Sequence, residues 1–145
     1  MTVAGADLFG RFSEVFLSDD IDGFMELVDD ECVWEIMATG EVFVGAANVR
    51  ELAERSVAAR THTADLHMRF GDHTITDDRM YLEYVHEGIV TEHWPASENR
   101  PAAGSRFELP ICLACRLKNG KFIRIYEYFD LGTVIAGGRN ARLYS

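Results

Sequence analysis

The sequence lacks any apolar run long enough to cross a bilayer, so we expect neither a membrane-spanning helix nor a membrane partner. Its first ten residues, MTVAGADLFG, have neither the basic start nor the continuous apolar segment of a secretory signal. Only three cysteines are present, and an odd number suits a reducing compartment better than a disulfide framework. Together these absences predict a cytoplasmic protein.

Positive charge is also scarce in this chain. It has 14 Lys and Arg residues against 24 Asp and Glu residues, which gives a net charge of −10 at pH 7. An acidic surface repels phosphate backbones and no basic patch offsets this repulsion, so we expect no nucleic-acid partner. Hydrophobic residues make up 48% of the 145 residues, enough for a single domain over residues 1–145 with its own core.

The only closely spaced cysteines, Cys112 and Cys115, have the C-x-x-C spacing of some redox and zinc sites. They lie in FELPICLACRL, which alternates between apolar and other residues as a β-strand does, so positions three apart point to opposite faces. The sequence therefore predicts core packing rather than a shared metal or a disulfide.

Apolar residues recur first at helical spacing and later at strand spacing. The later strand-like runs are joined by turn-rich segments, and Asn119-Gly120 supplies the tight turn of the last hairpin. This order predicts an α+β domain in which a cone-shaped, curved antiparallel sheet wraps around N-terminal helices and encloses an apolar pocket. The predicted helices are residues 5–17, 21–28 and 46–60, and the predicted strands are residues 31–38, 40–45, 62–72, 79–94, 106–120 and 121–130.

Several polar side chains are candidates for that pocket, each with a structural alternative. Strand alternation places His62 on an apolar face, where it is either a satisfied core residue or a functional group. Glu35 is either a solvated charge at a strand end or a pocket carboxylate. Gly88 can mark a bulge that reverses the alternation beyond it, so the orientation of His93 stays open. Asp130, at the end of FIRIYEYFD, either ends the strand as a surface charge or lies at the pocket mouth.

Two stretches of the chain carry a resemblance to a known family. The segment SDDIDGFMELVDDECVWEI, followed by GEVFVGAANVREL, resembles the start of the SnoaL-like, nuclear transport factor 2-like superfamily. Residues 104–130, with their G-K hairpin and closing Y-F-D, look like the limonene-epoxide hydrolase branch. The resemblance implies an α+β cone with one deep apolar pocket, commonly dimeric, that needs no metal and no organic cofactor. It also implies a small apolar molecule as partner, as in ketosteroid isomerases, polyketide cyclases, dehydratases and epoxide hydrolases.

The same resemblance implies roles for particular residues. Asp130 occupies the position of the base that activates water in the epoxide hydrolase branch. However, His93 and Pro95 replace the Arg-x-Asp pair of that branch, and proline cannot act as an acid, which argues against epoxide hydrolysis. Glu35 falls close to the general base of the isomerase branch. His62 falls near the histidine of dehydratase-like relatives, with Asp19 or Asp20 as its partner.

The sequence thus predicts a small-molecule acid–base enzyme that acts on an apolar substrate, of isomerase, cyclase, dehydratase or epoxide hydrolase type. A carboxylate in an apolar cavity has a raised pKa, which suits proton exchange near neutral pH. The alternative is a non-catalytic ligand-binding or partner-interaction module of the same fold. The predicted catalytic residues are Asp130, His93, Glu35 and His62, and the predicted substrate-binding residues are Trp34, Tyr84, Tyr128 and Met37.

Overall fold

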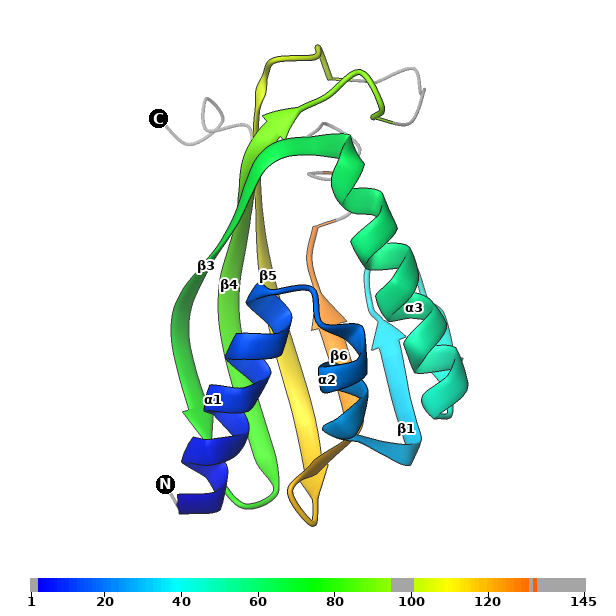
Figure 1. The fold of residues 1–145 in the computed structure, drawn as a ribbon, viewed down its shortest axis with the longest axis vertical. Helices are drawn as coiled ribbons and strands as arrows, with labels where there is room; N and C mark the ends of the chain where they lie inside the picture. The colour runs from blue at the N-terminus through cyan, green and yellow to red at the C-terminus, as the bar shows by residue number, and fades with distance from the viewer. Residues whose placement is uncertain (1–2, 95–100, 131, 133–145) are drawn as a thin grey trace.

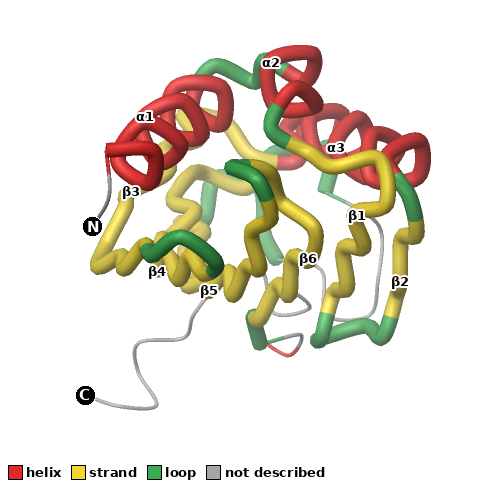
Figure 2. Tube along the Cα trace, turned by 90° about the horizontal axis from the view of Figure 1, so that it is seen from below, coloured by secondary structure: helices red, strands yellow, loops and turns green. Residues whose placement is uncertain are grey.

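Six strands form one curved sheet, and three helices cover one side of it (Figures 1 and 2). The computed structural model describes residues 3–94, 101–130 and 132. The strands lie in the order β2-β1-β6-β5-β4-β3. The helices are α1 (Val3–Leu17), α2 (Ile21–Glu26), α3 (Ala46–Ala58) and the short 3-10 helix η1 (Ala59–His62); the strands are β1 (Val28–Ile36), β2 (Glu41–Val44), β3 (Thr63–Ile75), β4 (Arg79–Val90), β5 (Arg106–Lys118) and β6 (Lys121–Tyr128).

The predicted α+β architecture is confirmed, with one difference in strand direction. All neighbouring strands are antiparallel except β1 and β6, which are parallel, so the sheet is mixed. The two strands are far apart in the sequence, and the chain passes through β2, α3, β3, β4 and β5 between them. No hairpin therefore fixes their relative direction, and a long crossover allows a parallel pair.

The second helix is shorter than predicted. It begins at the N-cap Asp20, whose side chain accepts a hydrogen bond from the Gly23 backbone N–H at 2.9 Å. It ends at Glu26 rather than residue 28, because Val28 already belongs to β1. The Leu27 carbonyl accepts a hydrogen bond from the Phe122 N–H at 2.8 Å, so pairing with β6 prevails over the helical spacing of these apolar residues.

Aromatic side chains fix the helices on the concave face of the sheet. Phe12 of α1 packs edge-on against Phe122 of β6, with ring centroids 5.6 Å apart. Phe24 of α2 meets Trp34 of β1 in the same manner at 5.9 Å. These contacts fix the two N-terminal helices on β6 and β1. The cavity described below lies next to them.

Strand alternation along β5 follows the prediction. Cys115 lies on the buried face, whereas Cys112 is half-buried on the opposite face. Burial raises the pKa of both thiols, which suits packing rather than reactivity. The hairpin to β6 turns at Asn119 and Gly120, which both adopt positive φ angles, 52° and 75°, as predicted.

The bulge expected near Gly88 lies on the neighbouring strand instead. The register between β4 and β5 is unbroken from Arg79 to Ile89, so the alternation of β4 does not reverse. The register with β3 shifts between Ala64 and His67, where Asp65 has a φ of 49°. A Cβ on Gly88 would lie 3.0 Å from the Ala64 carbonyl oxygen, so glycine allows the bulged strand to approach.

None of the helices in the described part of the chain is long and apolar enough to span a membrane.

Substitution of Gly88 tests the close approach of β3. We expect Gly88→Ala to lower the free energy of unfolding by about 1–3 kcal/mol, because the new methyl group meets backbone that must move. The matched control is Gly10→Ala on α1, where a Cβ meets nothing within 4 Å. That change should be neutral or raise stability by up to about 1 kcal/mol. Urea unfolding measures both, and equal effects would contradict the proposed packing.

Candidate active site

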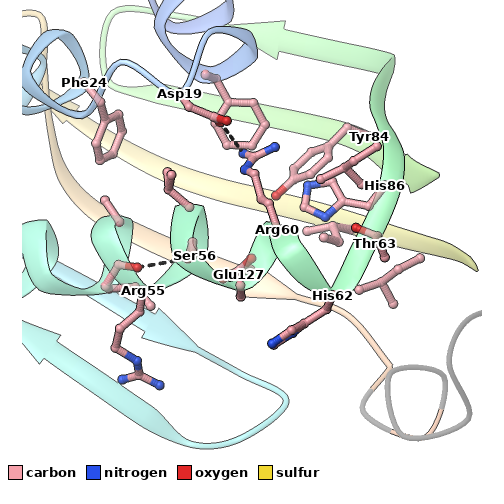
Figure 3. Close-up of a pocket in the computed structure, with 18 of the residues that line it drawn as sticks. Asp19, Phe24, Arg55, Ser56, Arg60, His62, Thr63, Tyr84, His86 and Glu127 are labelled. Carbon is pink, nitrogen blue, oxygen red and sulfur yellow. Dashed lines mark hydrogen bonds and ion pairs between the residues drawn. The ribbon is translucent and has the colours of Figure 1, made fainter. Parts of the chain in front are cut away.

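A cavity of about 510 Å³ lies between the concave face of the sheet and the helices (Figure 3). Its walls are mainly apolar, and its volume is in the range of small-molecule pockets. Among the polar residues of its lining, Asp20 and Arg55 are exposed, whereas Tyr84 is buried and His86 and Glu127 are partly buried. The apolar walls include Phe16 of α1, Phe24 of α2, Trp34 and Ile36 of β1, and Leu109 and Ile111 of β5.

The only carboxyl group on the sheet wall of the cavity, among the described residues, belongs to Glu127 of β6. It shares a face with Ile125, which is buried, and with Phe129, which also lines the cavity. Burial raises the pKa of Glu127 from 4.5 to about 7. The Trp34 indole N–H offsets part of this rise, although its geometry falls short of a regular hydrogen bond. At neutral pH, Glu127 can therefore both accept and donate a proton.

Tyr84 and His86 extend from β4 into the same cavity. Their ring centroids are 5.3 Å apart. Burial keeps the Tyr84 pKa well above its ordinary value, so its hydroxyl remains a hydrogen-bond donor. Burial, with a smaller effect of the Arg60 charge, lowers the pKa of His86 to about 4, so its imidazole is neutral near pH 7. The His86 Nε2 atom is buried and has no hydrogen-bond partner among the described residues.

Arg60 of η1, one of two arginines that line the cavity, projects along the same wall beside Tyr84 and His86 (Figure 3). One of its terminal nitrogens, Nη2, forms an ion pair with Asp19 Oδ1 at 2.9 Å. Asp19 lies in the loop between α1 and α2 with a φ of 57°, a left-handed conformation that aspartate tolerates. The Arg60 Nε atom is buried and, within the described part of the chain, lacks a partner.

The cavity rim is formed by aromatic rings near the end of β4. His62 lines the cavity and contacts Trp94 edge-on, with centroids 6.2 Å apart. Trp94 in turn packs against Phe107 of β5 at 5.3 Å. The Thr91 N–H donates to the His62 carbonyl at 2.9 Å, which ties the end of β4 to η1 and fixes this rim.

Three of the residues predicted from the sequence lie at the cavity: His62, Trp34 and Tyr84. The others do not line it. Glu35 alternates with Trp34 and Ile36 and therefore points to the outer face of the sheet. His93 is exposed in the turn beyond β4, with its Nε2 atom 3.8 Å from a Glu92 carboxylate oxygen.

Three more of the predicted residues, at or just beyond the C-terminal ends of β1 and β6, also lie outside the cavity. Met37 is exposed just after β1. Tyr128 and Asp130 are exposed and alternate with the cavity-lining Glu127 and Phe129. The Asp130 carboxylate accepts a hydrogen bond from the Gly132 N–H at 3.1 Å. The structure therefore does not bring Asp130, His93 and Glu35 together, and Pro95 lies outside the described residues.

Sequence reasoning missed Glu127, His86 and Arg60. A signal for the first two was present, because Glu127 alternates with Ile125 and Phe129, and His86 alternates with Leu82 and Tyr84. The closing Y-F-D of the resembled branch directed attention to Asp130 instead. Arg60 had no periodic signal, since it lies in a 3-10 turn between a helix and a strand. Within the described residues, no three side chains of the metal-ligating kind gather in one place.

Comparison with known proteins places this architecture in a family. The sequence model of the SnoaL-like domain matches residues 9–125. This chain belongs to the SnoaL-like domain family. The match does not single out the limonene-epoxide hydrolase branch. No curated protein matches the chain significantly.

Solved structures share the fold of this SnoaL-like domain at low sequence identity. A protein assigned as a SnoaL-like polyketide cyclase from Jannaschia sp. CCS1 is 12% identical, with a TM-score of 0.73 and 94% of each chain covered. IdmH from Streptomyces antibioticus, assigned as a polyketide cyclase, is 18% identical, with a TM-score of 0.70 over 91% of this chain and 96% of its own.

A third structure was solved with a small molecule. It is a protein with a ketosteroid isomerase-like fold from Catenulispora acidiphila, in complex with trimethylamine. It is 13% identical, with a TM-score of 0.67 over 91% of this chain and 93% of its own. These likenesses show that the fold is the nuclear transport factor 2-like α+β fold.

The raised pKa of Glu127 makes stability depend on pH in a defined direction. The folded chain holds this proton up to about pH 7, whereas the unfolded chain releases it near pH 4.5, so the stability it contributes is lost across that window. We expect the free energy of unfolding of the native protein, relative to Glu127→Gln, to fall by about 2–3 kcal/mol between pH 4.5 and 8.

Glu87→Gln is the matched control for this measurement. A hydrogen bond from Arg69 lowers the pKa of Glu87, so its contribution to stability is lost as the pH falls and has the opposite sign. Urea unfolding across the pH range separates the two effects. If the difference in the free energy of unfolding between the native protein and Glu127→Gln did not change with pH, the Glu127 carboxyl would not be held in an apolar environment.

Proposed function

We propose that this SnoaL-like domain is an enzyme that transfers protons at carbon in a small, largely apolar substrate, as an isomerase or a cyclase, and that it uses its own side chains for this chemistry. The observation that carries the proposal is the Glu127 carboxyl, whose pKa is about 7 in an otherwise apolar cavity. A general base works best when its pKa lies near the working pH, because it is then ionised yet still basic.

Glu127 acts as the base that removes a proton from the substrate and as the acid that returns it. Tyr84 donates a hydrogen bond from β4 of the same sheet wall, since its high pKa keeps the hydroxyl protonated. Trp34 provides a flat apolar surface beside Glu127 and orients the substrate. His62 contributes to binding at the rim, where it packs against Trp94.

The comparisons support this reaction class by analogy. Structures that share the fold are assigned as polyketide cyclases or described as ketosteroid isomerase-like. Epoxide hydrolysis receives less support, because Asp130, the base of that branch, does not line the cavity. A dehydratase with His62 as base is supported less than Glu127 chemistry, since its predicted partner is Asp19 or Asp20. Asp19 is engaged by Arg60, and the Asp20 carboxylate caps α2.

Substitution of Glu127 and Asp130 separates the two possible bases. With a panel of β,γ-unsaturated ketones and epoxides, we expect Glu127→Gln to lower kcat/KM by about 10²–10⁴-fold. Asp130→Asn should keep the activity of the native protein. In the native protein, kcat/KM should rise with pH through about pH 7, as Glu127 loses its proton.

The outcome of the same assay decides between the competing functions. Loss of activity in Asp130→Asn with retention in Glu127→Gln would assign the base to Asp130 and contradict the proposal. Binding of panel members without turnover, in both the native protein and the variants, would favour a non-catalytic binding module.

We also propose that the domain forms a homodimer through the outer face of its sheet. Large apolar side chains on this face are exposed: Val42 51%, Val44 61%, Tyr81 47% and Tyr128 46%. Val42 and Val44 lie on the outer side because their β1 partners, Glu35 and Val33, alternate with Trp34. Exposed apolar side chains that gather on one face of a sheet are a feature of protein interfaces.

A charge placed on this face tests the proposed dimer. We expect the native protein to sediment as a dimer and Val44→Glu to sediment as a monomer. Leu17→Glu is the control, because Leu17 is 53% exposed on α1, in the helical layer. A monomeric native protein, or equal dissociation by both variants, would contradict the outer-face interface.

A further inference from the structure

A buried hydrogen-bond donor lies on the cavity wall next to Glu127. It is the indole Nε1 atom of Trp34, which has no regular hydrogen-bond partner among the described residues. Trp34 is only 8% exposed, so bulk water has little access to this atom. The indole N–H of a buried tryptophan usually finds an acceptor, and an unpaired one therefore calls for an explanation.

The sheet register places this N–H close to the Glu127 carboxyl. Strands β1 and β6 run parallel, with Trp34 paired to Ile125 and Ile36 paired to Glu127. Because paired residues share a face of the sheet, Trp34 and Glu127 are diagonal neighbours on the cavity side, within reach of long side chains. The Met37 N–H donates to the Glu127 carbonyl at 2.9 Å, which fixes the register at this point.

Aromatic packing holds the Trp34 ring in this position. Phe24 of α2 packs against it with ring centroids 5.9 Å apart and an angle of 62° between the ring planes. Phe24 also contacts Phe122 of β6 at a centroid distance of 6.4 Å. The ring is thus held from the helical layer, and its N–H can meet an acceptor with little further loss of rotamer freedom.

The other neighbours of Glu127 on the sheet are apolar. Ile36 of β1 and Leu113 of β5 are its paired residues, and both are buried. Two effects act on the pKa of Glu127: burial raises it, and the Trp34 N–H lowers it by a smaller amount. Trp34 is therefore the donor that the sheet offers to this carboxyl.

The remaining ionisable side chains of the cavity make other contacts. They are Asp19, Asp20, Arg55, Arg60 and His62 on the helical side, and Tyr84 and His86 on β4. Among the described residues, none of them forms a hydrogen bond or an ion pair with Glu127. Arg60 is paired with Asp19, and Arg55 with Glu41. The Glu127 charge helps to raise the pKa of Tyr84, but Figure 3 shows Tyr84 apart from Glu127.

We propose that the Trp34 N–H binds one oxygen of the ionised Glu127 carboxylate and leaves the other oxygen directed at the substrate, which makes Trp34 a positioning residue for the base. This rests on the proposed function, in which Glu127 is the base. An indole N–H is a donor only, and its bond to a charged acceptor is about twice as strong as a bond between neutral groups. The contact therefore favours the carboxylate over the carboxylic acid.

Trp34 keeps its own proton throughout the reaction. The free oxygen of Glu127 takes the proton from the substrate carbon, and the C–H electron pair stays in the substrate. The bond from Trp34 weakens as the carboxyl becomes neutral, and it strengthens again when Glu127 returns the proton.

The indole N–H signal of Trp34 tests this contact by NMR without any substrate. The chain has two tryptophans, and Trp34→Phe assigns the signal by its absence. We expect the proton signal to move downfield as the pH rises, with the midpoint that the Glu127 carboxyl carbon shows in the same protein. The movement should be absent in Glu127→Gln. A Trp34 signal that stays constant while Glu127 titrates would overturn the proposal.

Removal of the N–H should also change the base itself. Trp34→Phe keeps an aromatic ring without the donor, so we expect the Glu127 midpoint and the pH profile of kcat/KM to rise together by about one pH unit. Ile36→Val is the matched control, because it loosens the packing beside Glu127 but removes no donor, and the midpoint should move by less than about 0.3 pH unit. If Trp34→Phe does not fold, benzothienylalanine at this position, which has sulfur in place of N–H, gives the same comparison.

Failure of this inference differs from failure of the proposed function. A Glu127 midpoint that falls or stays in place in Trp34→Phe, or that moves equally in Ile36→Val, would overturn the role of Trp34 while leaving Glu127-dependent turnover intact. Conversely, a Trp34 signal that follows the ionisation of Glu127 would support the contact even if no substrate of the panel were turned over.

Discussion

The burial of one carboxyl group in an apolar cavity is the constraint on which the site depends. Removing a carboxylate from water is costly, and the protein responds by raising the pKa of Glu127 rather than by pairing it with a cation. The cavity exists because long strands curve and because Phe12 and Phe24 hold the helices above the sheet at one end. A buried carboxyl group of this kind lowers the free energy of unfolding at neutral pH, but its pKa then lies where a general base works best.

His86 complements Glu127 in its effect on stability. The folded chain keeps His86 neutral down to about pH 4, so its contribution to stability is lost as the pH falls from about 6.5 to 4. The contribution of Glu127 is lost as the pH rises from 4.5 to about 7. The two slopes therefore oppose each other over most of the same range, and the intact protein should show less pH dependence than either group alone produces. Between about pH 4 and about pH 7, His86 and Glu127 are both mainly neutral. The cavity can then accept an apolar molecule without burying a charge on either group.

Much of the fold can be predicted from patterns of adjacent residues in the sequence. The alternation in β5 and the Asn119-Gly120 turn predicted their structures because each depends on a few adjacent residues. The parallel pairing of β1 with β6 and the bulge opposite Gly88 depend on strands distant in the sequence, and no local pattern contains them. The family resemblance, by contrast, predicted the right fold and family. It directed attention to Asp130, which lies three residues beyond the cavity-lining Glu127 and does not line the cavity. Arg60 depends on how the α3–β3 connection turns, which only the assembled structure shows.

The central claim is that the Glu127 carboxyl titrates near neutral pH inside the folded protein. The most direct test is to follow the chemical shift of its carboxyl carbon by NMR against pH, with the signal assigned by its absence in Glu127→Gln. We expect a midpoint near pH 7, the value to which burial raises this pKa. A midpoint near 4.5, the ordinary value for a solvated glutamate, would contradict it.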